Sequence, residues 1–60
     1  MNAMEVQTHA QKLYAALGSK AVAEAHTKVV EFEKSGAVGE AQDWKQIEAA
    51  LRTLSPPRAS

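Results

Sequence analysis

The stretch DWKQIEAALRTL, residues 43–54, contains the only tryptophan of the chain and its most regular apolar pattern. Large apolar side chains recur there at i, i+3, i+7 and i+10, namely Trp44, Ile47, Leu51 and Leu54. On an α-helix this spacing stacks them into one stripe. Glu48 precedes Arg52 by four residues, which is the favourable order for an ion pair along a helix. The stretch predicts a helix over 40–54 onto which the remaining segments pack.

A second helix is predicted over 3–17, where the apolar stripe consists of Val6, Ala10, Leu13 and Leu17, with Tyr14 beside it. Glu5 lies in the first turn, where the helix dipole favours an acidic side chain. Gly18 is a candidate C-cap of this helix, and Ser19 is a candidate N-cap of the next.

The segment 20–34 is predicted as the middle helix, with the stripe Val22, Ala25, Val29 and Phe32, widened by Val30. Glu24 and Lys28 have the spacing of an ion pair, and Lys34 lies in the last turn, where a cation is favourable. Ser35 and Gly36 indicate the end of this helix, and 36–39 is predicted as a connector.

A continuous helix through Gly18 is the alternative to the first break. It would place Val22 and Val29 roughly 140–160° around the axis from Val6 and Leu13, so its stripes would lie on nearly opposite faces. A break there lets both stripes face one core. At the second boundary the phase permits continuity, and the break rests on two glycines within 36–39, each costing about 1 kcal/mol in a helix.

These segments predict an all-α fold, a small three-helix bundle within a single domain, 1–55, followed by a short tail, 56–60. Pro56 and Pro57 disfavour further helix in that tail. A chain of 60 residues buries only about 60% of its unfolded surface, and it has no cysteine for a disulfide. We therefore expect self-association to complete the fold.

Seven basic and seven acidic residues leave the chain without net charge. A neutral domain has no long-range field that attracts nucleic acid or an anionic membrane. The first residues lack the pattern of a secretory signal, and no apolar run approaches the roughly 20 residues of a membrane span. We expect a cytoplasmic protein.

Few side chains suited to catalysis or metal binding are present. His9 and His26 are the only imidazoles, whereas a zinc site needs three or four ligands. We expect both histidines to pack half against the core, without a metal or cofactor. The glycines of 36–39 lack the lysine and the preceding strand of a phosphate loop, and no nucleophile-elbow motif occurs. We expect no enzyme.

A small protein-interaction module is the predicted function, with a second copy or a larger protein as partner. Trp44 and Tyr14 are of the types enriched at interfaces, although Trp44 can equally be the centre of the chain's own core. Tyr14, Val30 and Phe32 are predicted contacts at the edge of the bundle. Met4 and Val38, like Val30, lie outside the main stripes and are candidates for exposed apolar surface.

The alternative is a helix-turn-helix protein that binds nucleic acid. Its recognition helix would present Gln42, Lys45, Gln46 and Arg52 to the DNA. Glu24, Glu31 and Glu33 on the preceding helix, together with the lack of basic excess, argue against this alternative.

The run 43–47, followed by Ala49-Ala50-Leu51-Arg52 and the tail Pro-Arg-Ala-Ser, resembles short bacterial all-helical proteins of unknown function. The resemblance implies a bacterial cytoplasmic protein. It carries no catalytic or binding residues onto this chain.

Overall fold

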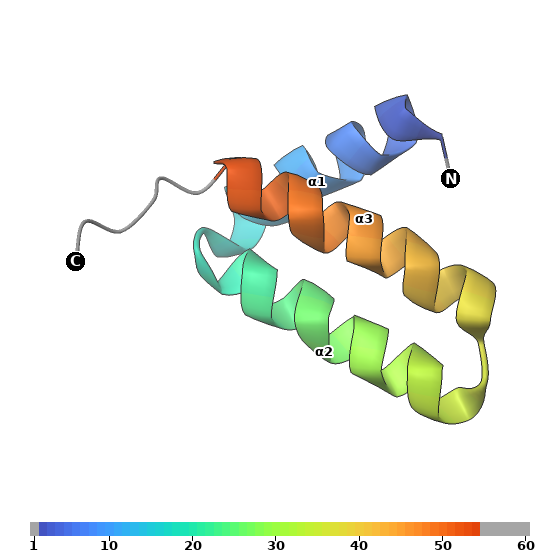
Figure 1. Ribbon diagram of the computed structural model, residues 1–60. Coiled ribbons are helices and arrows are strands. Elements are labelled where there is room, and N and C mark those ends of the chain that lie inside the picture. Colours follow the sequence, from blue (N-terminus) through green and yellow to red (C-terminus); the bar gives the residue numbers. More distant parts are fainter. Residues whose placement is uncertain (1, 55–60) are drawn as a thin grey trace.

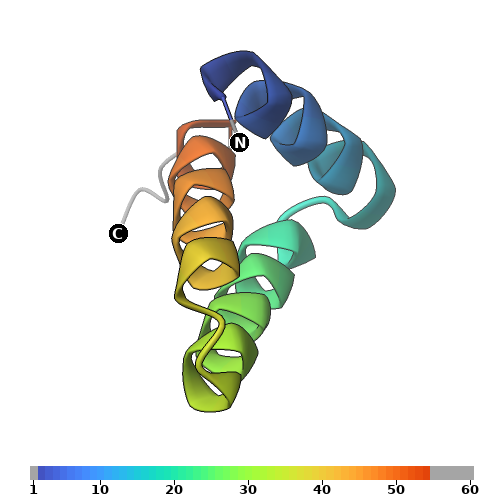
Figure 2. The same cartoon turned by 90° about the vertical axis from the view of Figure 1, so that its right-hand side faces the viewer.

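The computed structural model describes residues 2–54, which form three α-helices joined by two short turns (Figure 1). The helices are α1, Ala3–Leu17, α2, Lys20–Ser35, and α3, Val38–Leu54. α2 and α3 lie side by side as an antiparallel hairpin with the most extensive contact, and α1 packs across them, mainly on α3 (Figures 1 and 2). The predicted all-α three-helix bundle is confirmed.

α1 begins with a reciprocal cap that the sequence analysis did not identify. The Asn2 side chain accepts from the Glu5 backbone N–H at 2.9 Å, and the Asn2 backbone N–H donates to Glu5 Oε1 at 3.4 Å. This capping box satisfies two backbone donors that have no partner within a helix. Glu5 therefore stabilises the helix start through a hydrogen bond as well as through its charge.

The break at Gly18 is confirmed. Gly18 has φ 63°, which favours glycine, and its N–H donates to the Tyr14 carbonyl at 2.7 Å. Ser19 occupies the N-cap position of α2 as predicted, but it has helical dihedral angles and its side chain makes no capping hydrogen bond. A capping side chain reaches the helix N–H groups from an extended backbone, which Ser19 lacks.

α2 ends in a Schellman motif at Gly36, which has φ 82°. The N–H groups of Gly36 and Ala37 donate to the carbonyls of Glu33 and Phe32, at 3.2 and 2.9 Å. α3 then starts at Val38, two residues before the predicted start. The connector is therefore shorter than the predicted 36–39. Gly39 is helical because it lies in the first turn, where the Ala41 N–H already bonds the Ala37 carbonyl.

The core consists of few large side chains and many alanines. Within the described residues, only Ile47 and Leu51 are both large and fully buried. The other core residues are buried to at least nine tenths: Val6, Ala10, Ala21, Ala25, Val29, Ala41 and Ala50. Small alanine side chains let the helix axes approach closely. Two alanines lie in the buried face of α2, and two lie in the buried face of α3.

The predicted burial of Leu17 is wrong, because this side chain is 41% exposed at the last residue of α1. The chain turns at Gly18 before α2 can cover it.

None of the described helices combines the length and the apolar character that crossing a membrane requires. The predicted tail over 56–60 lies outside the described residues.

Gly36, which follows α2, and Gly39, which lies in the first turn of α3, provide a test of the α3 start. An added Cβ meets no atom within 4 Å at either position, but Gly36 has φ 82° and Gly39 is helical with a negative φ. We expect Gly39→Ala to raise the free energy of unfolding by about 0.5–1 kcal/mol and Gly36→Ala to lower it by about 1 kcal/mol. Urea denaturation measures both changes. Equal effects of the two substitutions would contradict the described helix boundary.

Candidate functional site

The residues predicted as core or interface anchors differ in how far they are buried and in whether they contact the core cluster. Ile47 and Leu51 are fully buried, and Trp44, Leu54 and Tyr14 are half-buried against the same core cluster. Val30 and Phe32 are also half-buried, but they do not belong to that cluster. The structure therefore leaves several large apolar side chains of the chain partly in contact with solvent.

Trp44 connects α3 to α1 through an aromatic contact with His9. The ring centroids are 5.4 Å apart and the ring planes meet at 66°, an edge-to-face arrangement. His9 is half-buried as predicted, whereas the same prediction for His26 is wrong, because its side chain is 64% exposed. His26 lies on the solvent side of the buried stripe of α2, next to Ala25.

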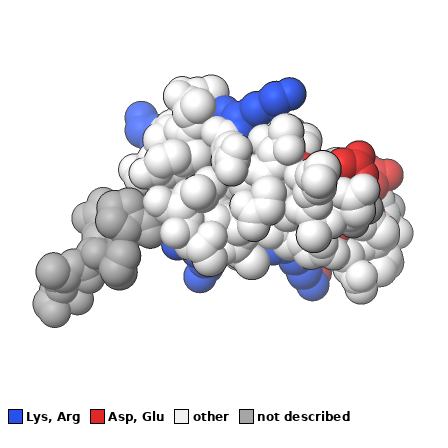
Figure 3. Space-filling model, turned by 90° about the horizontal axis from the view of Figure 1, so that it is seen from above, with Lys and Arg blue, Asp and Glu red and all other residues white. Residues whose placement is uncertain are grey.

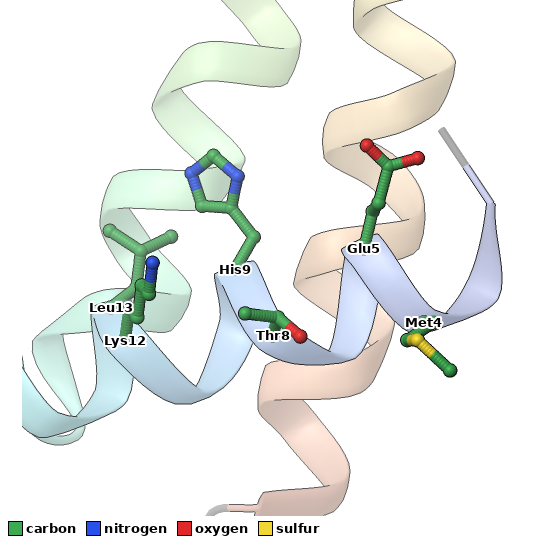
Figure 4. Close-up of a pocket in the computed structure, with 6 residues that line it drawn as sticks. All are labelled: Met4, Glu5, Thr8, His9, Lys12 and Leu13. Carbon is green, nitrogen blue, oxygen red and sulfur yellow. The ribbon is translucent and has the colours of Figure 1, made fainter.

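An open groove of about 480 Å³ lies along one face of α1, and we call it the α1 groove. Figure 4 shows its six lining side chains projecting from successive turns of α1, with α2 and α3 behind. They are Met4, Glu5, Thr8, His9, Lys12 and Leu13. Met4 is 78% exposed, so an apolar side chain, an acid and a base are all accessible on this face.

A second groove of about 370 Å³ lies where α1 meets α3. Alanines, amides, one valine and one threonine line it: Ala3, Val6, Gln7, Gln46, Ala49, Ala50 and Thr53. None of these side chains ionises near neutral pH. The second groove therefore supplies neither an acid–base pair nor a charge that would select a ligand.

Among the carboxylates whose ion pairs are described, Glu48 is the least exposed, with only 12% of its side chain accessible to solvent. Its Oε2 lies 2.6 Å from the Arg52 guanidinium and 3.5 Å from His26 Nδ1. The predicted pair with Arg52 is present, and the contact with His26 requires α2 and α3 to lie in register. This cluster joins the two helices at their polar margin.

A second ion pair across the hairpin joins Lys45 Nζ to Glu33 Oε2 at 3.0 Å. The predicted pair of Glu24 with Lys28 is not formed, and Lys28 Nζ lies 4.0 Å from Glu31 Oε1 instead. At i,i+3 and i,i+4 a lysine can reach either of two neighbouring acids, so spacing alone does not select one. Lys45, Glu33 and Glu31 are all at least half exposed at their side chains.

Within residues 2–54, no group of three or more His, Cys, Asp or Glu side chains is placed to hold a metal ion. The chain matches no protein-family model, no curated protein and no solved structure. The accessible faces of the helices are therefore the candidate binding surfaces of the described residues.

The Glu48–Arg52 pair is expected to be coupled energetically. A double-mutant cycle with Glu48→Ala and Arg52→Ala should give a coupling free energy of about 0.3–1 kcal/mol that decreases at high salt. Lys28 and Glu31, which lie 4.0 Å apart and are more accessible to solvent than Glu48, form a control pair for which we expect no measurable coupling. Equal coupling in both cycles would show that the enclosure of Glu48 has no energetic effect.

Trp44 is expected to stabilise the α1–α3 contact. A fully buried tryptophan costs about 3–5 kcal/mol when truncated to alanine, and half-burial reduces this to roughly 2 kcal/mol for Trp44→Ala. Trp44→Phe retains a ring against His9 and should lose less. Thermal denaturation and sedimentation measure the effects. An unchanged melting temperature and oligomeric state in Trp44→Ala would refute the assignment of Trp44 as an anchor.

Proposed function

We propose that the protein acts through contacts with protein chains, and in the first place with copies of itself, without catalytic activity. The supporting observation is the incomplete cover of its large apolar side chains. Among the large side chains of residues 2–54, only Ile47 and Leu51 are fully buried, while Trp44 and Phe32 are half-buried and Met4 is exposed. A partner that covers such surface gains free energy from its removal from water.

The size of the domain gives the same argument in thermodynamic terms. A hydrophobic core of a chain below about 70 residues rarely supplies more than 3–5 kcal/mol, and this chain has no disulfide to add stability. Association stabilises the folded state by mass action when only folded chains bind. Self-association therefore both stabilises the folded state and covers the accessible apolar side chains.

No observation favours the nucleic-acid alternative. In a helix-turn-helix the two helices cross at about 90–120°, whereas α2 and α3 run antiparallel side by side (Figure 2). Lys45 and Arg52, which would contact the DNA, form ion pairs with Glu33 and Glu48. Binding that weakens steeply as salt rises would support this alternative over an apolar interface.

The setting that we propose is the bacterial cytoplasm, which the resemblance of residues 43–60 implies. A larger protein is the second partner that we consider. It becomes the favoured partner if the chain does not bind itself.

Sedimentation equilibrium over a wide concentration range tests the proposal, with helicity followed by circular dichroism on the same samples. We expect mass and helicity to rise together, because association and folding are linked. A folded monomer at every concentration would refute self-association and leave an outside partner. Nucleic acid added at low salt serves as the control for the alternative.

A further inference from the structure

The six residues of the α1 groove form a pattern with two-fold symmetry in sequence. Its midpoint lies between Thr8 and His9, the two central lining residues. An acid and a base, Glu5 and Lys12, lie at equal distances from this midpoint. Two apolar residues, Met4 and Leu13, lie one position further out on either side. The pattern thus reads apolar, acidic, polar, polar, basic, apolar along the helix.

Such a pattern is complementary to itself when a second copy runs in the opposite direction. A two-fold axis through the midpoint places each Glu5 opposite the Lys12 of the other copy and each Met4 opposite its Leu13. Isologous dimers require this kind of complementarity, since one patch must bind an identical patch. Oppositely charged residues at equal distances from the axis fix both register and direction.

We propose that the α1 groove is the interface of a homodimer in which the two α1 helices pack antiparallel. This inference rests on the proposed self-association and specifies the surface that carries it. Two inter-chain ion pairs between Glu5 and Lys12 flank the centre of the contact, and Met4 and Leu13 lie against each other at its two ends.

The two charged residues are available for these pairs. Lys12 is exposed and makes no ion pair within the described part of the chain. The capping box engages only Oε1 of Glu5. Figure 3, which views the molecule from above, where α1 lies, shows a largely uncharged surface with charged side chains at its margins.

Other arrangements lack this complementarity. A parallel pairing of two α1 helices in register would place Glu5 opposite Glu5 and Lys12 opposite Lys12, which is repulsive. The second groove has no ionisable side chain to fix a direction. A second copy in the antiparallel orientation is therefore the occupant whose charges match the α1 groove.

Charge reversal provides the test. In Lys12→Glu homodimers two acidic pairs would oppose each other, and in Glu5→Lys homodimers two basic pairs would do so. We expect each variant alone to have a dimer dissociation constant raised about ten- to hundredfold at low salt. In an equimolar mixture of the two variants both pairs are again of opposite charge. The mixture should therefore form heterodimers with nearly wild-type affinity.

Two controls separate the interface from effects on folding. Lys20→Glu makes the same charge change at an exposed residue of α2 and should leave dimerisation unchanged. Because Glu5 also closes the capping box, circular dichroism is recorded for each variant. Met4→Lys provides an independent variant, since Met4 is 78% exposed in the single chain and has no capping role. It should weaken the dimer severalfold, and the exposed Ala23→Lys should not.

The outcomes distinguish this inference from the proposed function. Wild-type protein that stays monomeric at all concentrations refutes both. Wild-type protein that dimerises while Lys12→Glu and Met4→Lys dimerise equally well refutes the α1 interface and leaves self-association standing. Variants that are weakened singly but not restored in the mixture refute the antiparallel register. Heterodimers from the mixture establish the interface and its direction.

Discussion

Close approach of α2 and α3 is the constraint on which the rest of the structure depends. Ala21 and Ala25 of α2 and Ala41 and Ala50 of α3 are all buried, and side chains this small let neighbouring helices approach closely. Ile47 and Leu51 then fill the space that remains among the three helices. Small side chains allow this approach, but they contribute little apolar surface to the core. Close contact is thus obtained at the expense of hydrophobic stabilisation.

Polar interactions at the margins add a defined register to this small core. Glu33 and Lys45 join α2 to α3 near the turn, and Glu48 with His26 joins them toward the other end. Pairs of partly exposed charges such as Glu33 and Lys45 contribute little stability individually. They do distinguish one alignment of the two helices from its neighbours, because a shift by one residue separates both pairs. Apolar packing holds the hairpin together, and the charges determine how it is aligned.

α1 packs on the hairpin with one face and presents another face to solvent. Val6 and Ala10 are buried in the core, and His9 reaches Trp44 at the edge of the contact. The adjacent face carries Met4, Glu5 and Lys12 into solvent. A helix that is held firmly on one side and accessible on the other is suited to bind a partner. This is why we propose α1, and not the Trp44 region of α3, as the interaction surface.

The sequence by itself determined the features that depend on neighbours a few residues apart. It indicated three helices, the ends at Gly18 and Gly36, and the pair of Glu48 with Arg52. These follow from backbone dihedral angles, apolar periodicity and i,i+4 spacing, all of which are local.

Only the tertiary structure decided how each helix is rotated about its axis and which residues meet across helices. It buried Ala41 and Ala50, left Leu17 exposed, and brought His9 to Trp44 and His26 to Glu48. Periodicity identifies an apolar stripe but leaves its centre uncertain by tens of degrees when alanines flank it. The final rotation is the one that packs all three helices together. It therefore depends on contacts between residues far apart in the chain, which local patterns do not specify.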